Sequence, residues 1–302
     1  ATYREGLAEA VAAPGQPYRD VGDVDTALGD AHTRLDAVYH APHLAHAPME
    51  PPCATARVVD GACECWAPTQ NPQAAQAEVA QALGIPPEKV TVHVTLLGGG
   101  FGRKSKPDYV VEAALLAAVT QRPVQLIWTR EDEIRHGYYH AVSTQRMEAG
   151  LDEDGNVTAW LGRSAYPDIG TTWNPAQSVP GAGGMGLGFT DVPYEIPNLR
   201  VEACEARGHV RIGWFRSVCN VFHAFAVCSF ADELAAARGL DPLDNLHQLL
   251  GSDRDVDLSG VQYGNYGESL ADHPISTGRL KAVLDAAAKG IGWGRTLPRG
   301  KG

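Results

Sequence analysis

Alternation of apolar and polar residues predicts strands in the first half of the chain. These segments are 34–39, 55–59, 64–66, 90–97 and 123–128. Apolar residues recur at four-residue spacing over 71–83, before Gly84, and a broad apolar face follows Pro107, so both segments are predicted helices. The order strand, helix, strand over 90–128 predicts a βαβ unit, which places ligands at the carboxyl ends of its strands.

The second half of the chain combines a predicted hairpin with helices. Two extended runs, 143–151 and 157–163, flank the turn sequence Asp-Glu-Asp-Gly-Asn. Residues 181–188 contain five glycines without periodicity, which indicates a surface loop that is mobile or ordered by a partner. The remaining predicted helices are 221–238, with Phe222, Phe225 and Phe230 among the residues of its inner face, one after Asp241-Pro242, and 279–289. Residues 252–277 are predicted to be a polar linker with little core potential.

Composition limits the classes of function. The 302 residues carry a net charge of −11, and an acidic chain is a poor nucleic-acid binder because such binding depends on clustered Lys and Arg. The 44% of hydrophobic residues is enough for a real core, but no uninterrupted apolar run could span a bilayer. The chain begins without methionine and without the features of an export signal, so we expect a processed piece, an excised piece or one part of a longer subunit.

A glycine-rich segment directly after the predicted strand 90–97 is the strongest candidate site. Residues 98–104 read Gly-Gly-Gly-Phe-Gly-Arg-Lys, and glycines allow a ligand to approach the backbone closely. A phosphate-binding P-loop needs a glycine where Arg103 stands, and a dinucleotide fingerprint needs its third glycine at the same place. Both nucleotide interpretations are therefore disfavoured, whereas a plain turn without a ligand stays open.

Cysteine and histidine spacing gives weaker signals. The six cysteines lack Cys-x-x-Cys spacing, which argues against a zinc ribbon or an iron–sulfur site and leaves disulfides open. Cys63 and Cys65 would share one face of a strand, typically as small, half-buried side chains rather than as metal ligands. His40, His43 and His46 recur every three residues, but in an extended chain the middle one faces away, and structural hydrogen bonds are favoured over zinc.

Three motifs occur in the order seen in a known family. They are Trp-Ala-Pro-Thr-Gln-Asn-Pro at 66–72, the glycine loop at 98–104 and Gly-Trp-Phe-Arg-Ser-Val at 213–218, supported by 46–51, 129–132 and 191–198. Over nearly its whole length the chain resembles the large, molybdopterin-binding subunit of xanthine oxidase family molybdenum hydroxylases. It most resembles the branch of isoquinoline 1-oxidoreductase beta-subunits and related aldehyde dehydrogenases. This implies an α+β fold with mixed sheets and packed helices, of the aldehyde oxidase and xanthine dehydrogenase type.

The resemblance also implies roles for particular residues. Gln70 would hydrogen-bond an oxo or sulfido ligand of molybdenum, the Phe101 amide with Gly100 and Gly102 would lie against the metal's ligands, and Arg216 would support the same site. Alone, each has a structural interpretation: Gln70 as a helix cap or solvent-facing side chain, Phe101 as core, and Arg216 as the partner of an acid. No side chain of this chain would bond to the metal directly.

Two further positions would belong to the substrate pocket. Ser105 stands where the purine-oxidising branch has a substrate-binding Glu, and Val218 stands where that branch has a stacking Phe. Purines are therefore disfavoured, and N-heteroaromatic compounds or aldehydes are expected. Lys104, between the glycines and Ser105, is expected to be exposed to solvent or to brace the loop.

The family chemistry is oxidative hydroxylation, with electrons leaving through iron–sulfur clusters. The implied cofactor is molybdenum–molybdopterin, expected in its cytosine dinucleotide form, and the 2Fe-2S clusters lie on a small partner subunit. The base glutamate is expected outside this chain, on a continuation or a second fragment of the large subunit, so the isolated chain is expected to be inactive. We divide it into 1–150, with the Gln70 and glycine-loop motifs, and 151–302, with the Arg216 motif.

Other interpretations remain beside this one. The chain could be a non-catalytic cofactor-binding or subunit-docking module derived from the family, or, with weaker support, a nucleotide-dependent enzyme that uses the glycine loop. The expected location is bacterial and periplasmic or membrane-associated, with a cytoplasmic location left open.

Overall fold

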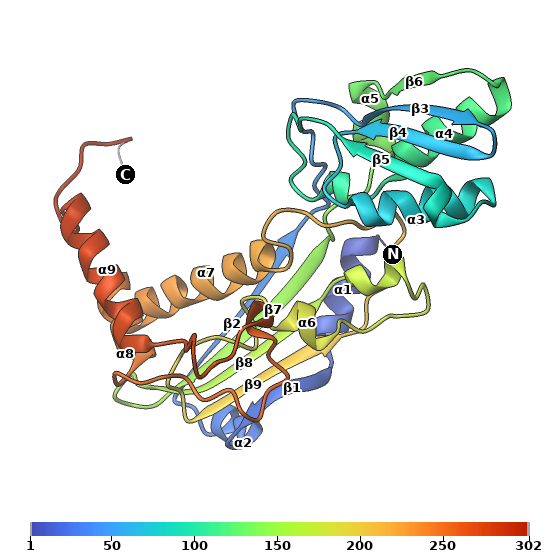
Figure 1. Ribbon diagram of the computed structural model, residues 1–302. Coiled ribbons are helices and arrows are strands. Elements are labelled where there is room, and N and C mark those ends of the chain that lie inside the picture. Colours follow the sequence, from blue (N-terminus) through green and yellow to red (C-terminus); the bar gives the residue numbers. More distant parts are fainter. Residues whose placement is uncertain (1, 301–302) are drawn as a thin grey trace.

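The computed structural model describes residues 2–300 and contains two mixed β-sheets with packed helices (Figure 1). The larger sheet has the strand order β1-β9-β8-β7-β2 and the smaller one β5-β4-β3-β6. The strands are β1 (Gln16–Val21), β2 (Thr33–Ala41), β3 (Cys53–Val59), β4 (Ala62–Ala67), β5 (Val90–Val94), β6 (Val124–Ile127), β7 (Ser143–Leu151), β8 (Val157–Ala165) and β9 (Asn198–Cys204). The predicted α+β class with mixed sheets is confirmed, as is the hairpin, which is formed by β7 and β8.

The helices cover the sheets and connect their strands. Their bounds are α1 (Tyr3–Ala12), α2 (Val24–Gly29), α3 (Pro72–Leu83), α4 (Asp108–Thr120), α5 (Arg130–His136), α6 (Ala182–Met185), α7 (Asn220–Arg238), α8 (Pro242–Leu250) and α9 (Thr277–Ile291). Gly84 ends α3, as the sequence predicts, and adopts the left-handed conformation. The cap at the start of α3 is Asn71, which accepts a hydrogen bond from Ala74, and not Gln70. The amphipathic α9 projects from the α8 end of the molecule (Figure 1).

The smaller sheet determines where the glycine loop lies. Strands β4 and β5 are parallel neighbours, paired from Cys63 with Val90 to Ala67 with Val94, and α3 connects them. The predicted βαβ unit over 90–128 is only partly right, because β3 and β4 lie between β5 and β6 in the sheet. The true neighbouring pair is β4 and β5, so the segments that follow them leave the sheet at the same edge.

Strand β5 is shorter than the predicted segment 90–97. Its partner β4 ends at Ala67 and is followed by Pro68, so β5 has no hydrogen-bonding neighbour beyond Val94. Thr95 donates one last bond to the Ala67 carbonyl, and Leu96 is then 96% exposed. The apolar residues before the glycine loop are therefore surface residues and not an extension of the sheet.

Several expectations about burial were wrong. Residues 181–188 are not a surface loop, because α6 forms within them and Met185 is fully buried in the core of the larger sheet. The linker 252–277 contributes Val256 and Leu258, both buried, to the interior. On α7, Phe225 was expected on the inner face but is 50% exposed, with its ring edge against Tyr39.

Local sequence patterns predicted none of α1, β1, α2, α5 and β9. Division of the chain after residue 150 stays a prediction, and β1 and β2, which precede that point, share the larger sheet with β7, β8 and β9. Within residues 2–300, no helix is both long and apolar enough to cross a membrane.

Candidate cofactor-binding site

Three chain segments that are far apart in sequence meet at the edge where β4 and β5 end. The Gly102 amide donates to Gln70 Oε1 at 2.9 Å, and the Gln70 amide donates to the Lys104 carbonyl at 3.0 Å. From the third motif, the Arg216 amide donates to the Phe101 carbonyl at 2.9 Å. Main-chain hydrogen bonds thus join all three predicted motifs into one unit.

A cavity of about 590 Å³ opens at this junction, and we call it the cofactor cavity. Of the predicted site residues it is lined by Gln70, Phe101, Gly102, Ser105, Arg216 and Val218. The seventh, Gly100, lies behind Gln70: a Cβ on Gly100 would be 2.3 Å from Gln70 Oε1. The structure therefore brings together every residue that the sequence proposed for the site.

Gly102 requires its lack of a side chain for two separate reasons. Its φ is 97°, which L side chains rarely adopt, and a Cβ there would lie 2.2 Å from the Trp214 carbonyl oxygen. The contact is with backbone, so a larger residue would have to separate the glycine loop from the third motif. Phe101 has a φ of 52° and is exposed beside Gly102.

The glycine loop and the side chains beside it carry hydrogen-bond donors that have no acceptor among the described residues. Within residues 2–300, the amides of Gly99, Gly100 and Phe101 donate to no protein acceptor, and Gly100 is nevertheless buried. The side-chain nitrogen Nε2 of Gln70 and the guanidinium of Arg216 likewise have no partner among these residues, and the guanidinium lies 5.8 Å from the Phe101 ring centroid. Successive free amides with a neutral carboxamide and one cation suit a ligand rich in oxygen or sulfur and negative in charge.

Two buried ion pairs hold the glycine loop, and local sequence patterns reveal neither of them. Lys104 is completely buried and its Nζ lies 2.5 Å from a carboxylate oxygen of Glu50. Arg103, also completely buried, binds both carboxylate oxygens of Asp108 at 2.9 and 3.0 Å. Of the two roles expected for Lys104, the structure shows the second: the residue is buried and braces the loop. Its Nζ binds Glu50 and is therefore not free to bind a phosphate.

The pKa of the Glu50 carboxyl is lowered by its contacts with the glycine loop. Burial raises the pKa of its carboxyl, but the hydrogen bonds from Lys104 and from the Gly98 amide outweigh burial and hold the pKa below its usual range. The carboxylate at this position joins the segment before β3 to the loop after β5. Nothing in the local sequence pairs residue 50 with residue 104, so only the fold reveals it.

Histidines brace the third motif. His46 Nε2 lies 2.5 Å from the Trp214 carbonyl oxygen, and His140 Nε2 lies 3.0 Å from the Val218 carbonyl oxygen. Burial lowers the pKa of both imidazoles. His43 is likewise within hydrogen-bond distance of a main-chain carbonyl, and His40 of Thr144, so the expected structural role of His40, His43 and His46 is confirmed.

Cys63 and Cys65 share one face of β4, as predicted, with their sulfurs 3.6 Å apart and both side chains buried more deeply than expected. Within residues 2–300, no group of three or more His, Cys, Asp or Glu side chains could hold a metal ion. The cofactor cavity is thus lined by hydrogen-bond donors and has no set of metal ligands.

The sequence profile of the molybdopterin cofactor-binding domain matches residues 9–246. The chain belongs to this family. It is 33% identical over 247 residues to a nicotinate dehydrogenase subunit of Pseudomonas putida, covering 79% of this chain and 21% of that protein. It is 30% identical over 237 residues to the beta subunit of isoquinoline 1-oxidoreductase of Brevundimonas diminuta, covering 74% and 29% respectively. The predicted resemblance is therefore confirmed.

The fold agrees with that assignment. The structure of aldehyde oxidoreductase from Desulfovibrio gigas superimposes with a TM-score of 0.63 and 22% identity, over 76% of this chain and 25% of that one. At this identity the likeness shows the fold alone. The chain spans between about a fifth and a third of the length of each of these three proteins.

Proposed function

We propose that this chain forms part of the molybdenum-cofactor-binding subunit of an oxidoreductase that oxidises N-heteroaromatic compounds or aldehydes. The observation that carries the proposal is the cofactor cavity, where the three motifs converge and leave unused donors. The family assignment makes molybdopterin the ligand for which these donors are suited. When bound, the molybdenum group supplies the two-electron redox chemistry of substrate oxidation.

Each residue of the cavity has a defined task in this proposal. The Gln70 carboxamide keeps its oxygen on the Gly102 amide and turns its NH₂ group to the cofactor, so that its orientation is fixed before the cofactor binds. The Phe101 amide and its neighbour Gly100 offer main-chain donors at close range, because no Cβ on Gly100 or Gly102 intervenes. The exposed Arg216 guanidinium adds positive charge beside a negatively charged group.

Two residues of the cofactor cavity support the proposed substrate class. Ser105 and Val218 both line the cavity, at the positions where the purine-oxidising branch has a substrate-binding Glu and a stacking Phe. Two relatives are named nicotinate dehydrogenase and isoquinoline 1-oxidoreductase, and these names support N-heteroaromatic compounds as the substrate class.

The proposal includes partners and a location. A small subunit with 2Fe-2S clusters would accept the electrons, and a continuation or second fragment of the large subunit would supply the base glutamate. The cofactor would be the cytosine dinucleotide form of molybdopterin, and the assembly would be bacterial and periplasmic or membrane-associated. The isolated chain would bind part of the cofactor without turnover, because general base catalysis needs a positioned proton acceptor.

The test is substitution of Gln70 in the native assembly, with molybdenum content and turnover measured on the same samples. Gln70→Ala removes a preorganised donor, and such a loss typically lowers turnover on the order of 10²-fold or more. The matched control is Gln73→Ala, at an exposed glutamine near the start of α3 that lies outside the cofactor cavity and whose side chain forms no hydrogen bond within the described residues. The control should retain full turnover.

The possible outcomes separate a catalytic assembly from a docking module. Full molybdenum occupancy with unchanged turnover in Gln70→Ala would remove the residue from the site. An assembly that binds the cofactor but oxidises neither heteroaromatic compounds nor aldehydes would be the non-catalytic module that the sequence left open.

A further inference from the structure

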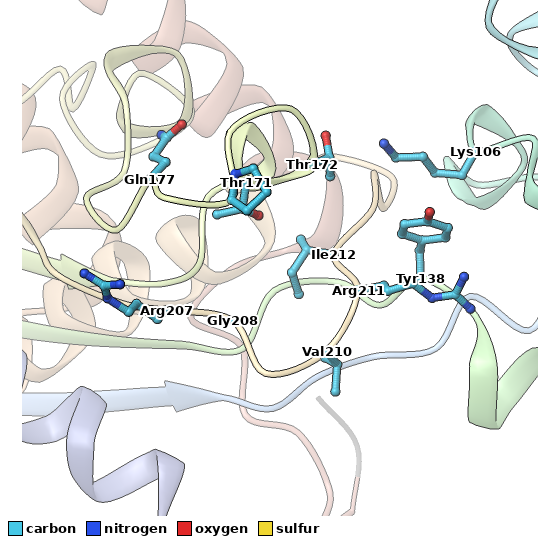
Figure 2. Close-up of a pocket in the computed structure, with 11 residues that line it drawn as sticks. Lys106, Tyr138, Thr171, Thr172, Gln177, Arg207, Gly208, Val210, Arg211 and Ile212 are labelled. Carbon is cyan, nitrogen blue, oxygen red and sulfur yellow. The ribbon is translucent and has the colours of Figure 1, made fainter. Parts of the chain in front are cut away.

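A second cavity, of about 410 Å³, lies beside the cofactor cavity, and Figure 2 shows its lining. Lys106 and Tyr138 form one wall. The rest of the lining consists of Thr171, Thr172, Pro175, Gln177, Arg207, Gly208, Val210, Arg211 and Ile212. In Figure 2 the Lys106 amino group points across the cavity toward Thr172. We call this space the lysine cavity. Its volume suits a small organic molecule of one or two rings.

The cation in this cavity is surrounded by aromatic rings, and among residues 2–300 no carboxylate lies within 4 Å of it. Lys106 Nζ lies 5.4, 5.2 and 5.1 Å from the ring centroids of Tyr138, Trp173 and Trp214. Unlike Lys104 and Lys281, Lys106 forms no ion pair within residues 2–300. The rings stabilise the ammonium through cation–π attraction but accept no strong hydrogen bond, so its three N–H donors stay available.

Other polar groups of the cavity divide into satisfied and unsatisfied ones. Arg207 pairs with Glu205, and Arg211 lies 3.5 Å from Asp108, whose single negative charge it shares with Arg103, so the lining keeps a net positive charge. The Thr172 hydroxyl is buried and has no hydrogen-bond partner within residues 2–300. A buried hydroxyl without a partner destabilises the fold, and a bound acceptor would remove that cost. The unsatisfied groups, Lys106 and Thr172, face one another (Figure 2).

Two connections join the lysine cavity to the cofactor cavity. Lys106 follows Ser105, which lines the cofactor cavity. The ring that holds Lys106 from one side belongs to Trp214, which also lines the cofactor cavity. A molecule whose charged end sits at Lys106 would therefore lie next to the candidate cofactor site.

We propose that the lysine cavity binds the carboxylate of an aromatic acid, held by the Lys106 ammonium and the Thr172 hydroxyl, and thereby selects anionic aromatic substrates. Opposite charge and two donors specify a carboxylate, and the flat rings around Lys106 suit an aromatic body. The selection of substrates rests on the proposed function, whereas the binding of the acid does not.

The experiment compares pyridine-3-carboxylate with pyridine-3-carboxamide, which has nearly the same shape and no charge. Calorimetric titration of the native assembly should give a Kd at least about tenfold lower for the carboxylate, as expected for a charge-assisted hydrogen bond. Lys106→Met keeps most of the side-chain volume and should raise the Kd of the carboxylate about tenfold or more without a comparable change for the carboxamide. Lys89→Met, at an exposed lysine outside this cavity, is the matched control and should change neither.

Several results would overturn the inference. They are equal affinity of the wild-type assembly for both compounds, an unchanged Kd for the carboxylate in Lys106→Met, or equal loss of both affinities in that variant. If Lys106→Met does not fold, Thr172→Val takes its place, with the same selective loss expected and the same outcomes decisive.

Turnover of the two compounds, measured on the same samples with their molybdenum content, separates this inference from the proposed function. Selective binding at full molybdenum occupancy without turnover of either compound, of isoquinoline or of an aldehyde would refute the proposed function and leave the carboxylate site standing. Turnover without selective binding would refute the carboxylate site alone.

Discussion

Three glycine-to-alanine substitutions separate the reasons why glycines are needed at this site. Gly155, in the turn between β7 and β8, has a φ of 79°, and nothing lies within 4 Å of the position that an alanine methyl group would take. Gly100 has no positive φ, but its Cβ would be 2.3 Å from the flexible end of Gln70. Gly102 combines a φ of 97° with a contact of 2.2 Å to the Trp214 main chain.

The expected magnitudes follow from those contacts. A left-handed conformation costs alanine about 1–2 kcal/mol, which is the whole expected loss for Gly155→Ala. Gly102→Ala adds overpacking against backbone, about 1–3 kcal/mol, for a total of about 2–5 kcal/mol. Gly100→Ala should change the free energy of unfolding by less than about 1 kcal/mol, because Gln70 can swing away and alanine reduces the entropy of the unfolded chain.

Turnover should rank the three variants in a different order from the free energy of unfolding. Gly100→Ala displaces the Gln70 carboxamide, so turnover of the native assembly should fall sharply although stability is nearly unchanged. Gly155→Ala should lose stability and keep turnover. Urea unfolding of the 302-residue chain gives the first quantity, and turnover per molybdenum in the assembly gives the second. Equal destabilisation by Gly102→Ala and Gly155→Ala would show that the close approach to Trp214 is not what requires a glycine.

Two other predictions concern the charges that support the fold. Glu50→Gln leaves the completely buried Lys104 ammonium without its carboxylate and should lower the free energy of unfolding in urea by about 3–5 kcal/mol. Lys104→Met leaves the partly exposed Glu50 carboxylate, which can hydrate, and should lower it by only about 1–3 kcal/mol. A larger loss in Lys104→Met than in Glu50→Gln would contradict the assigned burial. Burial lowers the pKa of His223 from about 6.5 to about 3. Between these two pH values the unfolded chain binds a proton at this residue that the folded chain does not. The residue alone should therefore reduce the free energy of unfolding by about 1.4 kcal/mol for each unit by which the pH falls. His223→Gln should remove that part of the slope between about pH 6 and 4, and an unchanged slope would argue against a neutral, buried imidazole at this position.

The periodicity of apolar residues alone was sufficient to predict the strands of the smaller sheet and most of the helices packed against it. The four-residue spacing before Gly84 and the alternation around Cys63 and Cys65 are local signals that the fold preserves. Order within the sheet is not local: β5 pairs with β4, and β6 lies two strands further on. Strand β5 stops at Val94 only because its neighbour stops at Ala67, a limit that the continuing run of apolar residues does not reveal.

The segments that were misjudged show the same dependence on distant contacts. Five glycines in 181–188 suggest exposure, yet Met185 is buried because the segment packs against the core of the larger sheet. Phe225 follows the helical spacing of the buried face of α7 but lies at its margin, against Tyr39. Spacing predicts which residues share a face, and the packing of other elements decides how far that face is covered.

The candidate site residues were recognisable because their motifs are short and continuous, whereas the residues that hold them are dispersed. Gln70, Gly102 and Arg216 each lie within a recognisable run. Their supports, Glu50 and His46, reach the site from the segment before β3 and contact residues 54 and 168 positions away. A single sequence carries no signal for such pairs, since neither residue type nor spacing specifies the partner.

Backbone strain gives an independent reason to regard the junction of the motifs as a site. Phe101, Ser217 and Val218 all line the cofactor cavity with positive φ, of 52°, 70° and 46°. Such a conformation is a genuine outlier for a β-branched residue and costs on the order of 1–3 kcal/mol. It persists here because hydrogen bonds to Phe101 and Val218, from Arg216 and His140, fix the backbone on both sides. The protein therefore maintains a costly backbone where its three motifs meet around a common cavity, which is the arrangement that a preorganised ligand site requires.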